Sequence, residues 1–174
     1  EAGGHNGREE TTTLTLIPMV TNQVTIPVIA AGGISTGAAM HAAMILGAAG
    51  VQMGTRFAMT TESSAHQNFK EVCVNTQEGE TSLTLKELAP VRLIRNKFYN
   101  DVQEAYANCA TKEDLITLLG RARSKKGMFE GDLEEGELEI GQIVGLINEI
   151  KSVEEVMNEI INDFNASTQK VFNF

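Results

Sequence analysis

Two short apolar segments, each followed at once by glycine, constrain the fold of this chain more than any other feature. Residues 27–31 run into Gly32 and Gly33, and residues 51–53 run into Gly54. Residues 27–31 do not alternate polar and apolar side chains, which is typical of parallel strands that are covered on both faces, and residues 51–53 predict the next strand. We therefore expect two buried strands that both end in tight turns.

The residues between these strands predict a single helix. Alanine, methionine and leucine are frequent in residues 37–46, Ser35 or Thr36 can cap the first turn, and Gly47 can end the last one. A strand, a helix and a second strand within about thirty residues form a βαβ unit, in which the strands are parallel. The carboxyl ends of both strands then lie at one edge, with the two glycine turns side by side.

Paired glycine turns at the ends of parallel strands favour phosphate binding. In a barrel of alternating strands and helices, ligands lie where the strands end, and phosphates favour the loops after the last two strands. A Cβ at Gly32, Gly33 or Gly54 would keep phosphate oxygens away from the backbone N–H groups. Each turn alone is most simply a tight connection, whereas the pair predicts a phosphate site.

His5 is the candidate catalytic residue. It lies in a loop, residues 1–7, that contains three glycines and lets a ligand approach the main chain closely. A histidine in such a loop can act as a general base or donate to a substrate oxygen. The alternative, which the local sequence alone favours, is an ordinary surface histidine. His41 and His66 are expected to be structural, and no group of residues has the spacing of metal ligands or of a serine or cysteine nucleophile site.

Charge and cysteine content exclude several classes of protein. The formal net charge of −9 argues against nucleic acid or an anionic membrane as the main partner, since both need a basic surface. No apolar run approaches about 18 residues, so we expect no transmembrane helix. Cys73 and Cys109 are too few for a disulfide framework and predict reduced thiols in a cytoplasmic protein. The basic residues within 121–126 are expected to pair with acidic residues within 130–139 or to be solvated.

The rest of the chain predicts mainly helices. Helices are expected at residues 17–23, 62–75, 91–107, 111–120, 140–150 and 152–164, with a short strand at 83–85 and an irregular segment at 127–141. Capping boxes of Thr111 with Asp114 and of Ser152 with Glu155 support two of these helices. Gln142 lies at the start of a predicted helix, where its amide could face a site or only cap the helix.

Four motifs together resemble the flavin-dependent barrel proteins that include nitronate monooxygenases and FMN-dependent enoyl-acyl-carrier-protein reductases. They are the loop at 1–7, the segments at 27–34 and 51–57, and the pair at 141–142. The resemblance implies an α/β fold that is the C-terminal portion of a (β/α)8 TIM barrel, with the end of strand 6 and strands 7 and 8, followed by a mainly helical region. Residues 1–60 would belong to the barrel, and residues 61–174 would cover the mouth of the active site and close the barrel.

The resemblance also implies the functional residues. FMN would bind non-covalently, with Gly32 and Gly33 matching the first phosphate loop and Gly54 and Thr55 matching the second. His5 matches the family histidine that lies beside the flavin. The further cofactor contacts that the resemblance implies are Gly3, Gly4 and Gln142.

Two activities occur in proteins of this kind. Residues 8–13, 54–57 and 62–70 match the pattern of the reductase branch. This match favours NADH- or NADPH-dependent reduction of a 2-enoyl thioester in fatty acid synthesis, with a small-molecule or acyl-carrier-protein-bound substrate. The alternative is oxidation of alkyl nitronates with oxygen.

A third interpretation is an inactive fragment that binds only a phosphate ligand. The family barrel has strands before the histidine loop, whereas this chain starts within that loop at Glu1. We therefore expect a piece of a longer polypeptide, or a chain whose partner strands are supplied elsewhere. A homodimer is compatible with the resemblance, and partners such as nucleic acid or a membrane are not expected.

Overall fold

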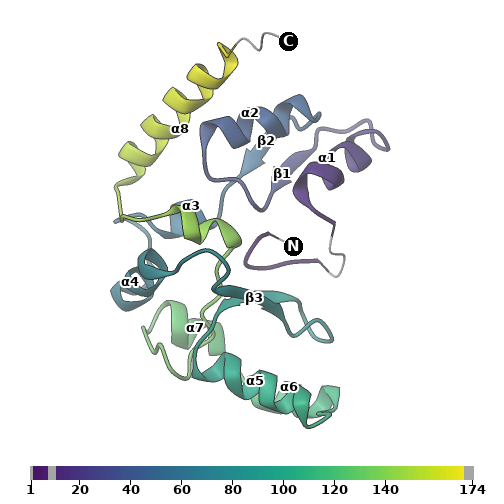
Figure 1. Cartoon of the computed structure of the whole chain (residues 1–174), viewed down its shortest axis with the longest axis vertical. Coiled ribbons are helices and arrows are strands. Elements are labelled where there is room, and N and C mark those ends of the chain that lie inside the picture. The colour runs from purple at the N-terminus through teal and green to yellow at the C-terminus, as the bar shows by residue number, and fades with distance from the viewer. Residues whose placement is uncertain (1, 8–10, 171–174) are drawn as a thin grey trace.

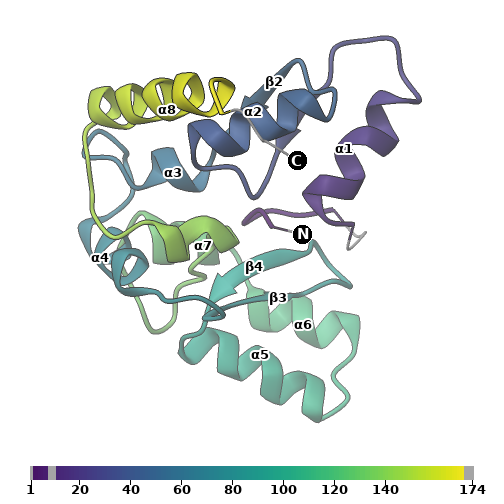
Figure 2. The ribbon, with the colours of Figure 1, turned by 45° about the horizontal axis from the view of Figure 1, so that its top comes forward.

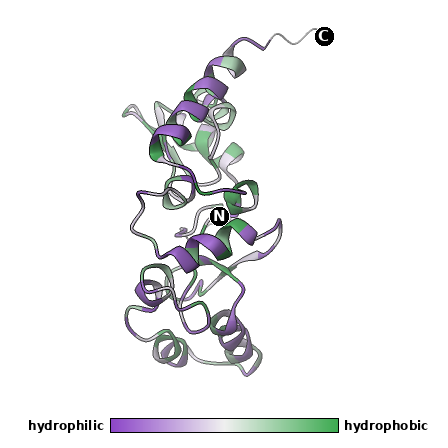
Figure 3. Cartoon of the chain, turned by 90° about the vertical axis from the view of Figure 1, so that its left-hand side faces the viewer, coloured by the Kyte–Doolittle hydropathy of each residue, from purple (hydrophilic) through white to green (hydrophobic). Residues whose placement is uncertain are grey.

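The computed structural model describes residues 2–7 and 11–170, which form a body elongated along one axis (Figures 1 and 3). Its upper part in Figure 1 contains the predicted βαβ unit, in which β1 (Ile29–Ala31) and β2 (Gly50–Gln52) are parallel and α2 (Gly37–Ile45) connects them. The hydroxyl of Thr36 accepts a hydrogen bond from the N–H of Ala39 at 3.1 Å and caps α2. The predicted unit and its cap are confirmed.

Two further helices complete the upper part. α1 (Thr13–Thr21) precedes β1, and α8 (Val153–Thr168) lies along α2 (Figure 2). The contact between α2 and α8 is close because Gly37 has no side chain. A Cβ at this position would overlap the backbone of Ile160 and Phe164. The first helix begins earlier than predicted and the last one ends later.

The lower part is built on an antiparallel pair of strands, β3 (Thr81–Thr84) and β4 (Val91–Ile94), with α5 (Lys97–Ala107) and α6 (Lys112–Leu119) packed below it. The predicted helix over 91–107 is therefore wrong for its first residues. β4 is a strand because it has main-chain partners on both edges. β3 occupies one edge, and residues from the N-terminal loop and from 138–140 occupy the other. All four residues of β4 are buried.

Short elements connect the two parts. α3 (Thr55–Ala58) follows β2 almost at once, and α4 (Gln67–Asn75) and α7 (Arg123–Met128) lie below it in Figure 1. The helix predicted over 140–150 is wrong, because only a 3₁₀ turn, η1 (Gln142–Leu146), forms there. Glycine is required just before this turn, since a Cβ on Gly141 would meet the main chain and side chains of other segments.

Local signals in the C-terminal half are confirmed. Both capping boxes form, those of Thr111 with Asp114 and of Ser152 with Glu155. The basic segment pairs with the acidic one as expected. These ion pairs include Lys125 with Glu130 at 2.9 Å and Lys126 with Asp132 at 3.1 Å.

Three apolar clusters form the core. The cluster of the upper part consists mainly of small side chains, namely Ile17, Ala30, Ile34, Ala43 and Ala48. The other two clusters contain larger residues, including Phe69 in the middle and Phe98 in the lower part, and both of these rings are fully buried. Within residues 2–7 and 11–170, no helix is both long enough and apolar enough to cross a membrane.

Candidate functional site

The two glycine turns and the N-terminal loop converge on one pocket. Gly32 and Gly33 follow β1, Gly54 follows β2, and the N-terminal segment lies close to both strand ends (Figure 2). The pocket has a volume of about 210 Å³. Its lining residues are Ala2, Gly3, Gly4, His5, Ala31, Gly32, Gly33, Ile34, Gln52, Gly54, Thr55 and Ile143. Every predicted site residue except Gln142 therefore lines the same pocket.

The geometry of this pocket suits an anion. Gly32 and Gly33 have φ angles of +91° and +73°, a left-handed region that favours glycine. A Cβ on Gly54 would meet no atom within 4 Å, so the adjoining space is open. Among the residues that the structure describes, none accepts a hydrogen bond from the N–H of Gly33, Gly54 or Thr55. The turns therefore present backbone donors next to open space.

Two hydrogen bonds connect the pocket to the start of η1. The hydroxyl of Thr55 accepts a hydrogen bond from the N–H of Gly141 at 3.0 Å. The N–H of Gln142 donates to the carbonyl of Ala2 at 2.9 Å. Gln142 itself is exposed and lines two adjoining pockets instead of this one. A contact of the Gln142 side chain with a cofactor stays a prediction. The backbone N–H of Gln142 holds the N-terminal loop through Ala2.

β4 holds His5 at the pocket. His5 forms an antiparallel bridge with Val91, and the N–H of Arg92 donates to the carbonyl of Gly4 at 2.7 Å. The side-chain amide of Asn6 donates to the same carbonyl at 3.2 Å. Neither the pairing with β4 nor the role of Asn6 was predicted from the sequence. An asparagine within a glycine-rich loop was an available signal for Asn6, whereas nothing local relates this loop to β4.

The imidazole of His5 lies beside a carboxyl group. Its Nδ1 is 3.6 Å from Oε1 of Glu139, and the two side chains are 72% and 21% exposed. Burial raises the pKa of the Glu139 carboxyl, and the nearby His5 opposes that rise. Glu139 was not predicted as a site residue, because its partner His5 lies at the opposite end of the chain.

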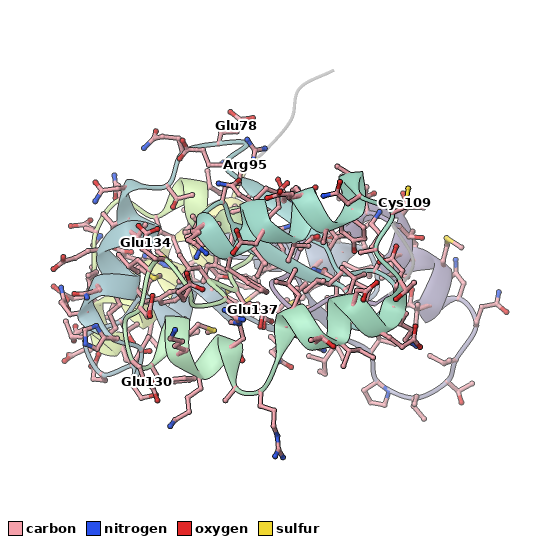
Figure 4. All side chains as sticks on the ribbon, turned by 90° about the horizontal axis from the view of Figure 1, so that it is seen from below. Glu78, Arg95, Cys109, Glu130, Glu134 and Glu137 are labelled. Carbon is pink, nitrogen blue, oxygen red and sulfur yellow. The ribbon has the colours of Figure 1, made fainter. Side chains whose placement is uncertain are left out.

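A second buried carboxyl group lies on the same segment. Burial raises the pKa of Glu137 to about 7, and the charge of Glu139 adds to the rise. Figure 4 shows Glu137 near the centre of the molecule viewed from below, whereas Glu130 and Glu134 lie nearer the edge. Acidic side chains on this segment are thus divided between solvent and the interior.

The other two histidines have structural partners, as predicted. Nδ1 of His66 accepts a hydrogen bond from the N–H of Asn68 at 3.1 Å and caps α4. The ring of His41 packs edge-on against Phe164 with centroids 5.4 Å apart, and its Nδ1 lies 3.1 Å from the hydroxyl of Ser167. Neither histidine lines the pocket that contains His5.

The segment at 62–70 joins α3, α4 and α8. The buried ammonium group of Lys70 donates to the carbonyls of Thr60 at 2.6 Å and Ser63 at 2.9 Å. The carboxylate of Glu62 accepts a hydrogen bond from the N–H of Val153 at 3.0 Å, which lowers the pKa of Glu62. The reductase-like pattern here thus consists largely of residues that fix the scaffold. Its counterpart at 8–13 begins outside the described residues, which exclude 8–10.

The amino end of α2 already has an anionic partner. A carboxylate oxygen of Asp163, on α8, accepts a hydrogen bond from the N–H of Ala38 at 2.7 Å. A pocket of about 280 Å³ lies beside this contact, and charged side chains that line it pair with one another, as Arg56 does with Glu159 at 2.5 Å. The pocket formed by the two glycine turns and the N-terminal loop is called the glycine pocket. An anion in it would be held by the N–H groups of the turns more than by the dipole of α2.

Comparison with known proteins places the chain in a family. Residues 1–163 match the family model described as nitronate monooxygenase. The chain belongs to the nitronate monooxygenase family. A probable nitronate monooxygenase from Staphylococcus saprophyticus is 34% identical over 93% of this chain and 50% of its own length. The chain spans about half the length of the curated relatives it matches over most of its residues.

Solved structures agree with this assignment. FabK from Thermotoga maritima is 39% identical, with a TM-score of 0.85 over 97% of this chain and 53% of that chain. Nitroalkane oxidase from Streptomyces ansochromogenes is 27% identical, with a TM-score of 0.74 over 96% of this chain and 50% of that chain. The resemblance seen in the motifs is confirmed for the family, which is FMN-dependent. The fold is a mixed α/β portion that matches about half of the FabK barrel.

Proposed function

We propose that the glycine pocket binds the phosphate of FMN. The observation that carries this proposal is the convergence of both glycine turns and the histidine loop on one pocket. Within the described chain, the N–H groups of Gly33, Gly54 and Thr55 have no acceptor and are available to phosphate oxygens. Gly54 adds space, because a Cβ there would enter the open volume and contact nothing of the protein.

The chain would be the C-terminal part of the barrel, with residues 1–60 in its wall and residues 61–174 over its mouth. Large apolar side chains around α1 and β1 are exposed, including Leu14 at 69%, Ile26 at 72% and Ile29 at 56%. Each of β1 and β2 pairs only with the other among the described residues. In a closed barrel every strand has two neighbours, so further strands and helices would cover these surfaces.

For the intact protein, we propose NADH- or NADPH-dependent reduction of a 2-enoyl thioester. Bound FMN supplies the hydride-transfer chemistry. The exposed imidazole of His5 can donate a hydrogen bond or a proton to the thioester oxygen, which gains negative charge during reduction. An adjoining pocket of about 500 Å³, which includes Ile143 and Leu146, offers apolar surface for an acyl chain.

Oxidation of alkyl nitronates is the second candidate. The matched family model and the Staphylococcus saprophyticus relative carry the name nitronate monooxygenase. His5 has the exposure that a general base for a nitroalkane needs. The same pocket and the same bound flavin would serve both reactions, and the choice of substrate distinguishes them.

The test is a parallel assay of the intact flavoprotein. NADH and NADPH are supplied with a crotonyl thioester, and propionate 3-nitronate is supplied with oxygen. Crotonyl turnover that is lost in His5→Ala supports the reductase. Nitronate consumption without crotonyl turnover would reject the reductase activity and support the monooxygenase activity. The chain alone is purified separately. If it is colourless and binds inorganic phosphate but no FMN, it is an inactive phosphate-binding fragment, whatever the intact protein does.

A further inference from the structure

We propose that Glu139 positions the imidazole of His5 and sets which of its nitrogens carries the proton. This inference rests on the proposed role of His5 and names the residue on which that role depends. Oε1 of Glu139 lies 3.6 Å from Nδ1 of His5, which is an ion-pair distance. Among the described residues, no other carboxyl group forms an ion pair with His5.

The backbone fixes both partners on one edge of β4. His5 lies opposite Val91, and Glu139 lies opposite Leu93. Residues two apart on a strand face the same side, so the residues opposite them also share a side. The peptide groups of Arg92 link the two segments, because its N–H donates to Gly4 at 2.7 Å and its carbonyl accepts from Ile140 at 3.0 Å.

The N-terminal loop packs against the side chain of Glu139 at Gly4. A Cβ on Gly4 would come within 3.3 Å of Cγ of Glu139. A larger residue at position 4 would therefore require a small shift of the loop or of the Glu139 side chain. The carboxyl group is mostly buried, whereas the imidazole is mostly exposed towards the pocket. A largely buried carboxyl group beside an exposed imidazole is an arrangement that can orient a histidine.

The chemical consequence concerns the proton on the ring. A carboxylate beside Nδ1 favours a proton on Nδ1, and Nε2 is then the nitrogen that accepts or returns a proton at the substrate. When Nε2 is protonated, the carboxylate stabilises the imidazolium. The charged groups near Glu139 are His5 and Glu137, and Arg123 in turn faces Glu137. Both proposed reactions need this proton control, so the inference does not depend on which of them occurs.

Glu139→Met is the main test, because it keeps the length of the side chain and removes the carboxylate. In the intact flavoprotein, ¹⁵N chemical shifts of His5 report which nitrogen is protonated in the neutral ring. We expect Nδ1–H to predominate in the wild type and Nε2–H to predominate in the variant. We also expect kcat to fall about 10-fold with little change in KM, because part of the acid–base contribution is lost. Flavin content should stay at the wild-type level.

Two further variants distinguish positioning from a loss of structure. Glu139→Gln retains a side-chain oxygen that can face Nδ1 of His5 and should restore the wild-type tautomer. Glu137→Gln changes a neighbouring buried carboxyl that makes no ion pair with His5, and should leave the tautomer unchanged. A tautomer ratio in Glu139→Met equal to that of the wild type would overturn the inference, whatever the activity. If the wild type turns over neither substrate, the proposed function fails, and the tautomer ratio still decides the role of Glu139.

Discussion

The glycine-turn region (α1, β1, α2 and β2) and the β4 region (β3, β4, α5 and α6) bury their apolar side chains to different extents. The first has a core composed largely of alanine and leaves large residues such as Leu14 and Ile29 exposed. The second fully buries large residues, including Leu93, Phe98 and Val102. Burial of large apolar side chains is the main source of stability, so the β4 region is the more self-sufficient of the two.

The difference shows how the site is divided. The glycine turns belong to the region that leaves large apolar residues exposed. The loop that carries His5 is hydrogen-bonded to the other region, through the carbonyl of Gly4, which accepts from Arg92 of β4, and the N–H of Asn6, which donates to Pro90. The pocket lies where the two regions meet. We therefore expect substitutions in the β4 region to change stability, and substitutions in the glycine turns to change ligand binding.

Phe98→Ala should produce the largest effect. The ring is fully buried, and the guanidinium of Arg123 lies 4.7 Å from its centroid. Removing a buried phenylalanine leaves a cavity and costs about 3–5 kcal/mol in the free energy of unfolding. Denaturant unfolding of the intact protein measures this loss.

Leu14→Ala is the matched change in the glycine-turn region. In the chain alone, where this side chain is 69% exposed, it should cost less than about 0.5 kcal/mol. In the intact protein, further barrel elements should cover Leu14, and the cost should rise to about 2 kcal/mol or more. Equal and small costs in both would contradict the proposed place of the chain in the barrel.

Gly37→Ala should come next. The new Cβ would overlap the backbone of Ile160 and Phe164, so α8 must move away from α2. Such overpacking typically costs about 1–3 kcal/mol in stability. Hydrogen exchange of the α8 amides measures the displacement, and unchanged protection there would show that α8 is not held as described.

Gly54→Ala is the control for that substitution and tests the site. A Cβ at Gly54 meets nothing within 4 Å, so we expect the stability of the flavin-free protein to change little. Under the proposed function the methyl group obstructs the phosphate, and FMN should bind about 10-fold more weakly, which corresponds to about 1.4 kcal/mol. Flavin fluorescence titration measures this affinity. If the variant bound FMN as tightly as the wild type, the phosphate would not lie next to Gly54.

Glu137→Gln should have the smallest effect, and one that depends on pH. Burial raises the pKa of this carboxyl to about 7 from an ordinary 4.5. Between these values the folded protein keeps the proton and the unfolded chain releases it, so wild-type stability falls as the pH rises. The variant cannot ionise, and its stability relative to the wild type should increase by about 1 kcal/mol between about pH 6 and pH 7. Urea unfolding at both pH values measures the difference, which a pH-independent offset would contradict.

Features that depend on neighbouring residues could be predicted from the sequence. The glycine turns, the cap at Thr36 and the capping box of Ser152 with Glu155 all formed, because each depends on residues within one turn. The proximity of the two glycine turns also followed from local order, since parallel strands joined by one helix bring their carboxyl ends together.

Features that depend on distant partners could not be predicted. Residues 91–94 have helical spacing of apolar side chains, yet strands and loops from both ends of the chain hold them extended. Over residues 140–150 only a 3₁₀ turn forms, and its start is held by hydrogen bonds of Gly141 and Gln142 to Thr55 and Ala2, which are distant in the sequence. Glu139 was missed for the same reason, because only the fold brings it to His5.

The composition of the pocket also determines how binding should respond to salt. None of the described residues that line it is lysine or arginine, and the nearby amino end of α2 is paired with Asp163. A phosphate held by backbone dipoles interacts over a few ångströms, well inside the screening length of ordinary buffers, which is about 8–10 Å. Under the proposed function, flavin affinity should therefore vary little with ionic strength. The shape of the turns, rather than a long-range electric field, would select the ligand.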